Sequence, residues 1–143
     1  MRLAIGSDHA GFEMKEAIKA YLDKIKVEYK DYGTYTSDSM DYPDTGKAVA
    51  NAVADGQEEK GILICGSGIG MSIVANKVKG IRAALCCSAE IARLSREHND
   101  SNILVLAGRF TSREDAKEMV KAWLETPFSN DARHIKRIEK IEK

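Results

Sequence analysis

The sequence predicts an α/β protein with a Rossmann-like three-layer α/β/α sandwich, a five-stranded parallel sheet and a C-terminal helix. Two observations support this fold class. Short aliphatic runs alternate with amphipathic segments, which is typical of βαβ units, and right-handed crossovers then place helices on both faces of a parallel sheet. The 143 residues have the length of one domain with a full hydrophobic core, so residues 1–143 are expected to fold as one unit.

Five short runs are the expected strands, at residues 2–6, 27–32, 61–65, 81–86 and 102–107. A first helix follows Asp8, because apolar residues then recur at helical spacing. Residues 111–114 have the form of a capping box before a helix whose apolar residues fall at 116, 119, 120, 123 and 124. The last helix is expected to begin near residues 129–131 and to present Ile135, Ile138 and Ile141 on one side.

Composition excludes several classes of protein. The chain has 22 basic and 22 acidic residues, so its charge gives no reason to expect a nucleic acid or a membrane as partner. No apolar stretch reaches the length of a membrane span, and no signal peptide precedes the first strand. Three cysteines, with Cys86 and Cys87 adjacent, form neither a disulfide framework nor a zinc spacing. We therefore expect a cytoplasmic protein with free thiols, in which Cys86 and Cys87 pack at the end of a strand.

The most informative segment lies where the third strand ends. Cys65 closes the apolar run 61–64 and is followed by Gly66, Ser67, Gly68, Ile69 and Gly70, after which a helix is expected from Met71. Glycines let the backbone approach a ligand closely, and the free N–H groups at a helix start favour negative charge. The segment therefore predicts a thiol beside an anion-binding loop; the plain alternative is a tight turn with an inert, buried cysteine.

Other polar residues follow the neighbouring strands. Asp8 and His9 come after the first strand and Arg109 after the last, so they are expected at the same sheet edge as Cys65. His98 and Asn99 end the helix before the last strand, and helices end at the opposite edge. This placement puts His98 far from Cys65 within one chain, which suggests a site built from more than one subunit.

Several chemistries fail on a decisive residue. A dinucleotide loop needs its third glycine one residue later, where Met71 stands. A cysteine phosphatase needs an arginine at that position, and a receiver domain needs an aspartate in place of Cys65.

Acid–base chemistry on a phosphorylated carbonyl compound fits better, with Cys65 as base and the 66–70 amides and Ser67 holding an enediolate. No cofactor is implied, and no metal-ligand cluster occurs in the sequence, so a proton-transfer route is expected.

Five separated motifs extend over nearly the whole chain, at residues 6–12, 41–43, 61–77, 95–100 and 133–137. Together they resemble ribose-5-phosphate isomerase type B, in a family that also contains galactose-6-phosphate and allose-6-phosphate isomerases. The resemblance implies one isomerase domain that interconverts D-ribose 5-phosphate and D-ribulose 5-phosphate, a reaction of the pentose phosphate pathway. It also implies a homodimer or a dimer of dimers with each site between two subunits.

The resemblance implies a role for individual residues. Cys65 is the base between C1 and C2, His98 opens the furanose ring, and Ser67 donates to the enediolate. The sugar hydroxyls are held by Asp8 and Asn99. The phosphate is bound by His9, Arg109, Arg133 and Arg137, which suits a dianion. Two further candidates are Tyr42, as a pocket residue, and His134, at the phosphate site.

Alternatives remain open for these assignments. His98 is also consistent with a surface histidine at a helix C-terminus, and Arg133 with Arg137 is consistent with a solvated basic stripe, since the two are four residues apart. Arg109 could pair with a surface carboxylate, and Tyr42 could pack beside Pro43. The substrate could be allose or galactose 6-phosphate, and the chain could be a non-catalytic sugar-phosphate-binding partner subunit.

Overall fold

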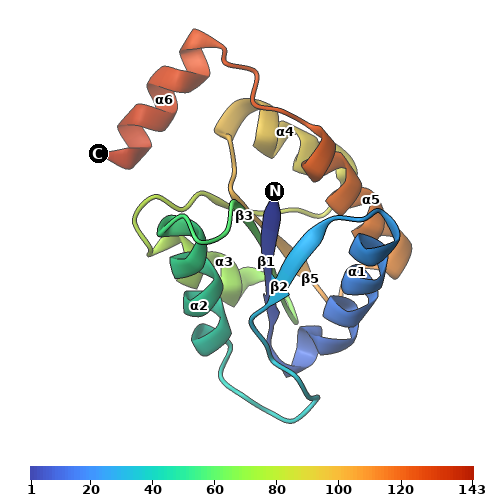
Figure 1. The fold of residues 1–143 in the computed structure, drawn as a ribbon. Helices are drawn as coiled ribbons and strands as arrows, with labels where there is room; N and C mark the ends of the chain where they lie inside the picture. Colours follow the sequence, from blue (N-terminus) through green and yellow to red (C-terminus); the bar gives the residue numbers. More distant parts are fainter.

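The computed structural model describes all residues from 1 to 143. Its centre is one parallel sheet with the strand order β2-β1-β3-β5-β4 (Figure 1). The strands are β1 (Arg2–Ser7), β2 (Glu28–Asp31), β3 (Lys60–Cys65), β4 (Ala83–Leu85) and β5 (Ile103–Ala107). All five lie within or next to the expected runs, so the prediction of a five-stranded parallel sheet is confirmed.

Helices cover both faces of this sheet (Figure 1). They are the short 3₁₀ turn η1 (His9–Gly11) and the helices α1 (Phe12–Lys24), α2 (Tyr42–Ala54), α3 (Ile69–Asn76), α4 (Ala89–Asn99), α5 (Arg113–Glu125) and α6 (Ala132–Glu142). Helices α1, α4 and α5 pack on one face, whereas α2 and α3 pack on the other. The expected α/β/α layers are therefore present.

Alternation along the strands builds a core on each side. In β1, Leu3 and Ile5 contribute to the core under α1, α4 and α5, whereas Ala4 contributes to the core under α2 and α3. This follows because successive side chains of a strand point to opposite faces. Trp123 of α5 is fully buried in the first core, where its indole N–H donates to Ser101 Oγ at 2.9 Å.

Two local expectations need correction. The cap of α5 is one residue later than the capping box at 111–114 suggests: Ser112 is the N-cap, and its Oγ accepts from the N–H of Asp115 at 3.1 Å. Cys86 is buried as expected, but Cys87 is exposed and is not a packing residue. Cys87 lies two residues beyond β4, a strand of only three residues at the edge of the sheet.

Helix α6 projects to one side of the layered fold and contacts it mainly near α4 and Arg82 (Figure 1). Asp131 caps it, within the expected 129–131 start, and none of its residues is buried. Ile135 and Ile141 are 38% and 61% exposed. Near its C-terminal end, Glu142 forms an ion pair with Arg82 at 2.6 Å. No helix of the protein has the length and apolar character needed to cross a membrane.

Candidate functional site

The carboxyl edges of β1, β3 and β5 form the base of the site. Ser7 of β1 is in register with Ile64, and Cys65 of β3 is in register with Ala107 of β5. The connections that leave these strands are joined by backbone hydrogen bonds: Asp8 N–H donates to Ile64 at 3.2 Å, and Gly108 N–H donates to Cys65 at 2.8 Å. Parallel pairing therefore brings three loops together, as expected for ligand sites in such sheets.

A pocket of about 510 Å³ opens at this edge. Sequence reasoning named every residue that lines it except Ala10 and Ile73; the lining consists of Asp8, His9, Ala10, Tyr42, Cys65, Gly66, Ser67, Ile69, Gly70, Ile73 and Arg109. Ala10 and Ile73 have no polar group, so no chemical pattern in the sequence marks them. Nine predicted site residues therefore meet within one chain.

The loop after β3 presents free backbone donors. Gly68 has φ of +78°, a left-handed conformation that glycine adopts without strain, and α3 begins at the next residue. The N–H groups of Gly66, Ser67 and Gly68 donate to no acceptor within the chain. The Ser67 hydroxyl accepts from Ile69 N–H at 3.2 Å, which leaves its own hydrogen available. These donors and the start of α3 favour an anionic group in the pocket.

Cys65 supplies the thiol beside these donors. It is 5% exposed and lies at the end of β3, immediately before the free amides. The three cysteines are all free thiols, but the other two lie outside the pocket. Burial raises the pKa of Cys86 to about 11, so that thiol stays protonated and unreactive near neutral pH.

Asp8 and His9 are fixed by the turn that follows β1. Asp8 caps η1, because its Oδ1 accepts from the N–H of Gly11 at 3.0 Å. His9 is held from the other side, where its Nδ1 accepts from the N–H of Met40 at 3.2 Å. Both side chains line the pocket, so one carboxylate and one imidazole face the same space as Cys65.

Arg109 and Tyr42 complete the pocket wall. The N–H of Arg109 donates to Gly66 at 3.0 Å, and its guanidinium has no carboxylate partner within the chain. The alternative that Arg109 pairs with a surface carboxylate is therefore wrong. Tyr42 lies so close to Gly70 that a Cβ there would be 2.6 Å from its ring. Glycine at position 70 is required for this contact, and Tyr42 is a pocket residue.

Gly68 also belongs to the loop after β3 but is not among the pocket-lining residues, whereas the remaining predicted residues lie at the opposite edge of the sheet. Asn99 ends α4 and accepts from Arg82 Nε at 2.8 Å through its backbone oxygen, close to where β4 begins. Parallel strands separate this edge from Cys65: the four steps from Ile103 to Ala107 alone span roughly 13 Å. The expected separation of His98 from Cys65 within one chain is thus present.

His98 meets the last helix at that edge. Its ring stacks on the ring of His134, with centroids 4.4 Å apart and planes 19° apart. Arg133 and Arg137 lie on the same helix, α6, and line one basic groove with Lys136 and Lys140. The structure therefore divides the predicted site into two groups: the Cys65 pocket, and a cluster of His98, Asn99, Arg133, His134 and Arg137.

Comparison with known proteins identifies the family. The model of the ribose/galactose isomerase family matches residues 3–141. The chain belongs to the ribose/galactose isomerase family. A relative from Escherichia coli, named ribose-5-phosphate isomerase B, is 46% identical over 140 residues, which cover 98% of this chain and 93% of that protein. A D-erythrulose-4-phosphate isomerase of Pectobacterium atrosepticum is 40% identical over 99% of this chain and 93% of its own length.

The fold of this family member is also that of its solved relatives. The structure of Clostridium thermocellum ribose-5-phosphate isomerase B superposes with a TM-score of 0.97 at 48% sequence identity, covering 99% of this chain and 95% of that one. The resemblance read from the five sequence motifs is therefore confirmed, as is the fold class.

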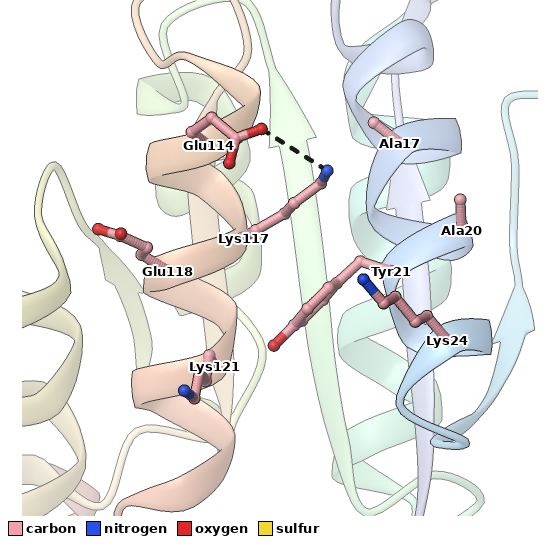
Figure 2. Close-up of a pocket in the computed structure, with 8 residues that line it drawn as sticks. All are labelled: Ala17, Ala20, Tyr21, Lys24, Glu114, Lys117, Glu118 and Lys121. Atoms are coloured by element: carbon pink, nitrogen blue, oxygen red, sulfur yellow. Dashed lines mark ion pairs between the residues drawn. The ribbon is translucent and has the colours of Figure 1, made fainter.

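A second pocket of this family member is chemically different. It is a groove between α1 and α5, where Tyr21 and Lys117 point between the helices (Figure 2). Glu114 pairs with Lys117 at 3.9 Å, and the groove contains no thiol, imidazole or free arginine. Nowhere in the chain do three or more histidine, cysteine, aspartate or glutamate side chains form a group that could hold a metal ion. The Cys65 pocket is the candidate site.

Proposed function

We propose that this protein interconverts D-ribose 5-phosphate and D-ribulose 5-phosphate. The principal support is one observation: a free thiol lies beside three backbone N–H groups that have no acceptor, in a pocket that also holds an unpaired arginine. An aldose–ketose isomerisation needs a base for a carbon-bound proton, donors for the developing enediolate and a phosphate anchor, and this pocket offers all three. The ribose-5-phosphate isomerase relatives point to the same substrate.

The proposed reaction is a proton transfer at Cys65. The thiolate takes the proton from C2 of the open-chain aldose, and the electron pair forms the C1–C2 double bond as charge moves to O1. The Ser67 hydroxyl and the amides of residues 66–68 stabilise this enediolate. The thiol then returns the proton to C1 while the hydroxyl proton of O2 moves to O1, which gives the ketose.

The phosphate is proposed to lie at the Arg109 and His9 side of the pocket. Arginine offers several N–H donors to phosphate oxygens, and this guanidinium has no internal partner. Asp8 faces the same space and accepts from sugar hydroxyls. Arg133 and Arg137 of a second copy are proposed to complete the phosphate site, since the basic groove on α6 is separate from the pocket in one chain.

We further propose a homodimer in which each pocket receives His98, Asn99 and α6 from its partner. Exposed apolar side chains support this arrangement: Ile69 and Ile73 of α3 line the pocket and are 56% and 57% exposed, with Leu85 of β4 close by. Such a patch beside a pocket is typical of a protein interface. A second copy seated there would bury the patch and bring a ring-opening histidine to Cys65.

A single domain in the cytoplasm suits this activity. The residues that line the pocket come from positions between Asp8 and Arg109, a range that begins directly after β1 and includes the other four strands, so one domain builds the pocket. All three cysteines are free, which is typical of a reducing compartment.

The proposal is tested by turnover of the purified, chelator-treated protein on four substrates: ribose 5-phosphate, allose 6-phosphate, galactose 6-phosphate and D-erythrulose 4-phosphate. We expect the highest kcat/KM on ribose 5-phosphate, unchanged by the chelator. A family relative is named D-erythrulose-4-phosphate isomerase, so weaker activity on the other sugar phosphates is expected. Activity on only one of the other sugar phosphates would overturn ribose 5-phosphate as the substrate and assign that sugar phosphate instead. No activity on any of the four would overturn the proposed function.

A further inference from the structure

A fully buried lysine lies outside the proposed catalytic machinery. The side chain of Lys15 in α1 is 0% exposed, and its Nζ donates to both carboxylate oxygens of Asp31, at 2.7 and 2.6 Å. The same ammonium lies over the rings of Phe12 and Tyr35, at 5.5 and 5.3 Å from their centroids. Removing two charges from water costs free energy that their attraction only partly returns. A buried ion pair is therefore weak evidence of a stabilising role.

The pair fixes the beginning of one particular segment, residues 32–41, which connects β2 to α2 along the carboxyl edge (Figure 1). Asp31 Oδ1 accepts from the N–H of Gly33 at 2.8 Å, and the Tyr35 hydroxyl donates to the Asp31 backbone oxygen at 3.0 Å. The pKa of Asp31 is held below its usual value: burial acts to raise it, but the hydrogen bonds from Lys15 and Lys19 outweigh that effect.

The same segment binds the end of β1, immediately before the pocket residues. Ser7 N–H donates to the backbone oxygen of Gly33 at 2.6 Å, and Thr34 N–H donates back to Ser7 at 2.8 Å. Asp8 and His9 are the next two residues of the chain. The position of their backbone therefore depends on where Gly33 and Thr34 lie.

The far end of the segment determines the hydrogen position on His9. The N–H of Met40 donates to His9 Nδ1 at 3.2 Å. A backbone amide can only donate, so Nδ1 must be the nitrogen without a hydrogen, and in the neutral ring the hydrogen is on Nε2. Because His9 lines the pocket, Nε2–H is its free donor.

We propose that Lys15 and Asp31 are positioning residues: they hold segment 32–41 so that Met40 fixes His9 as the Nε2–H tautomer, ready to donate to an oxygen of a bound phosphate. The identity of the anion rests on the proposed function, but the tautomer and its dependence on Lys15 do not. Neither residue touches the substrate; both act through Met40 and His9.

The experiment compares Lys15→Met with a matched control, Glu58→Gln. Glu58 is a buried carboxylate paired with Arg2 at 2.6 and 2.5 Å, remote from the pocket. In Lys15→Met, Lys19 still lies 2.8 Å from Asp31, so the carboxylate keeps a cation and the variant is expected to fold. Tyr35→Ala is a second variant at an exposed position, 68% accessible, which removes the ring over Lys15 and the hydroxyl contact.

Three readouts separate positioning from stability. Ring ¹⁵N NMR reports the tautomer of His9, which is readily assigned because the chain has only three histidines. Titration with inorganic phosphate measures anion binding without turnover, and steady-state kinetics on ribose 5-phosphate separates KM from kcat. The first two readouts remain valid if the proposed substrate is wrong.

We expect wild-type His9 to be the Nε2–H tautomer. Lys15→Met should mix the tautomers, weaken phosphate binding and raise KM about tenfold, the effect of losing roughly one hydrogen bond to an anion, with a smaller change in kcat. Tyr35→Ala should shift the same three readouts in the same direction, whereas Glu58→Gln should lower stability and leave them unchanged. An Nδ1–H tautomer in the wild type, or equal effects of Lys15→Met and Glu58→Gln on KM and on the tautomer, would overturn the proposal.

Discussion

Three thiols in this chain lie in three different environments. Cys86 is buried, and its pKa is raised to about 11 by that burial, whereas Cys87 is exposed after the short strand β4. Cys65 alone lies in the pocket, next to backbone N–H groups without an acceptor. Only this thiol is placed to take a proton from a pocket ligand, which sequence reasoning inferred from its position between a strand and a glycine-rich loop.

Substitution of Gly68 tests the geometry of the loop between β3 and α3. Gly68→Ala combines a left-handed φ of +78° with contacts of the new methyl against Leu85 and the backbone of Leu106. We expect the free energy of unfolding to fall by about 2–3 kcal/mol in urea denaturation. Gly56 is the control, because its φ is +77° but nothing lies within 4 Å of an added Cβ. Gly56→Ala should cost only about 1–2 kcal/mol, and an equal loss in both variants would argue against the close packing of Gly68.

At the residue scale, most of the polar pocket-lining residues could be predicted from the sequence because they lie at or just after the end of a strand. Asp8 comes directly after β1, Cys65 is the last residue of β3, and Arg109 follows shortly after β5. Pairing of parallel strands alone brings such positions together at one edge of the sheet. The contact of Met40 with His9 was missed, as was the Lys15–Asp31 pair. Both depend on the path of segment 32–41, which has no periodic pattern to reveal it.

Elements are joined at the amino edge by the Arg2–Glu58 pair, which makes stability depend on pH. The hydrogen bond from Arg2 is the main reason that the pKa of Glu58 lies below its ordinary value of 4.5. A carboxylate with a lowered folded-state pKa adds stability above the unfolded-state pKa and loses it as pH falls through the folded-state value. The contribution is therefore complete near neutral pH and disappears in acid.

We expect Glu58→Gln to lower the free energy of unfolding by about 1–3 kcal/mol at neutral pH. The difference from wild type should shrink as pH falls below about 4.5, because protonation removes the same interaction from the wild type. Urea denaturation of both proteins between about pH 7 and pH 3 measures this. A difference that stays constant over the whole range would show that the carboxylate charge plays no part.

Element boundaries were less predictable than element type. The fourth strand was expected over 81–86 but spans Ala83–Leu85, because the N–H of Arg82 donates to the side chain of Asn102 at 2.8 Å in place of a strand partner. Helix α2 was not placed individually from the sequence. Its buried face is built largely from small residues such as Gly46, Ala50 and Ala52, which give a weak apolar periodicity.

For the whole molecule, the proposed dimer explains why the predicted site falls into two groups at opposite sheet edges. The sequence placed His98 far from Cys65 from the alternation of strands and helices alone, and the structure has that separation. The order of strands and helices does not indicate which surface a second copy would cover. In the proposed dimer this surface contains the exposed Ile69 and Ile73, which lie beside the pocket.

Mixed dimers test the shared site. Cys65→Ala and His98→Asn should each be nearly inactive alone. If the site needs Cys65 of one copy and His98 of the other, each mixed dimer has one intact site of two, and random reassortment restores about one quarter of wild-type turnover. Each variant incubated alone under the same dissociating conditions is the control. No recovery in mixtures that contain mixed dimers would place both residues in one chain's site.

The central claim is that Cys65 moves the proton in a sugar-phosphate isomerisation. The most direct test is turnover of Cys65→Ala on ribose 5-phosphate, with ligand binding measured in the same samples and Cys87→Ala as the control thiol. We predict that Cys65→Ala loses at least about 100-fold in kcat, as expected when an acid–base group is removed, while the sugar phosphate still binds. Cys87→Ala should match wild type. Turnover of Cys65→Ala near the wild-type rate would contradict the account.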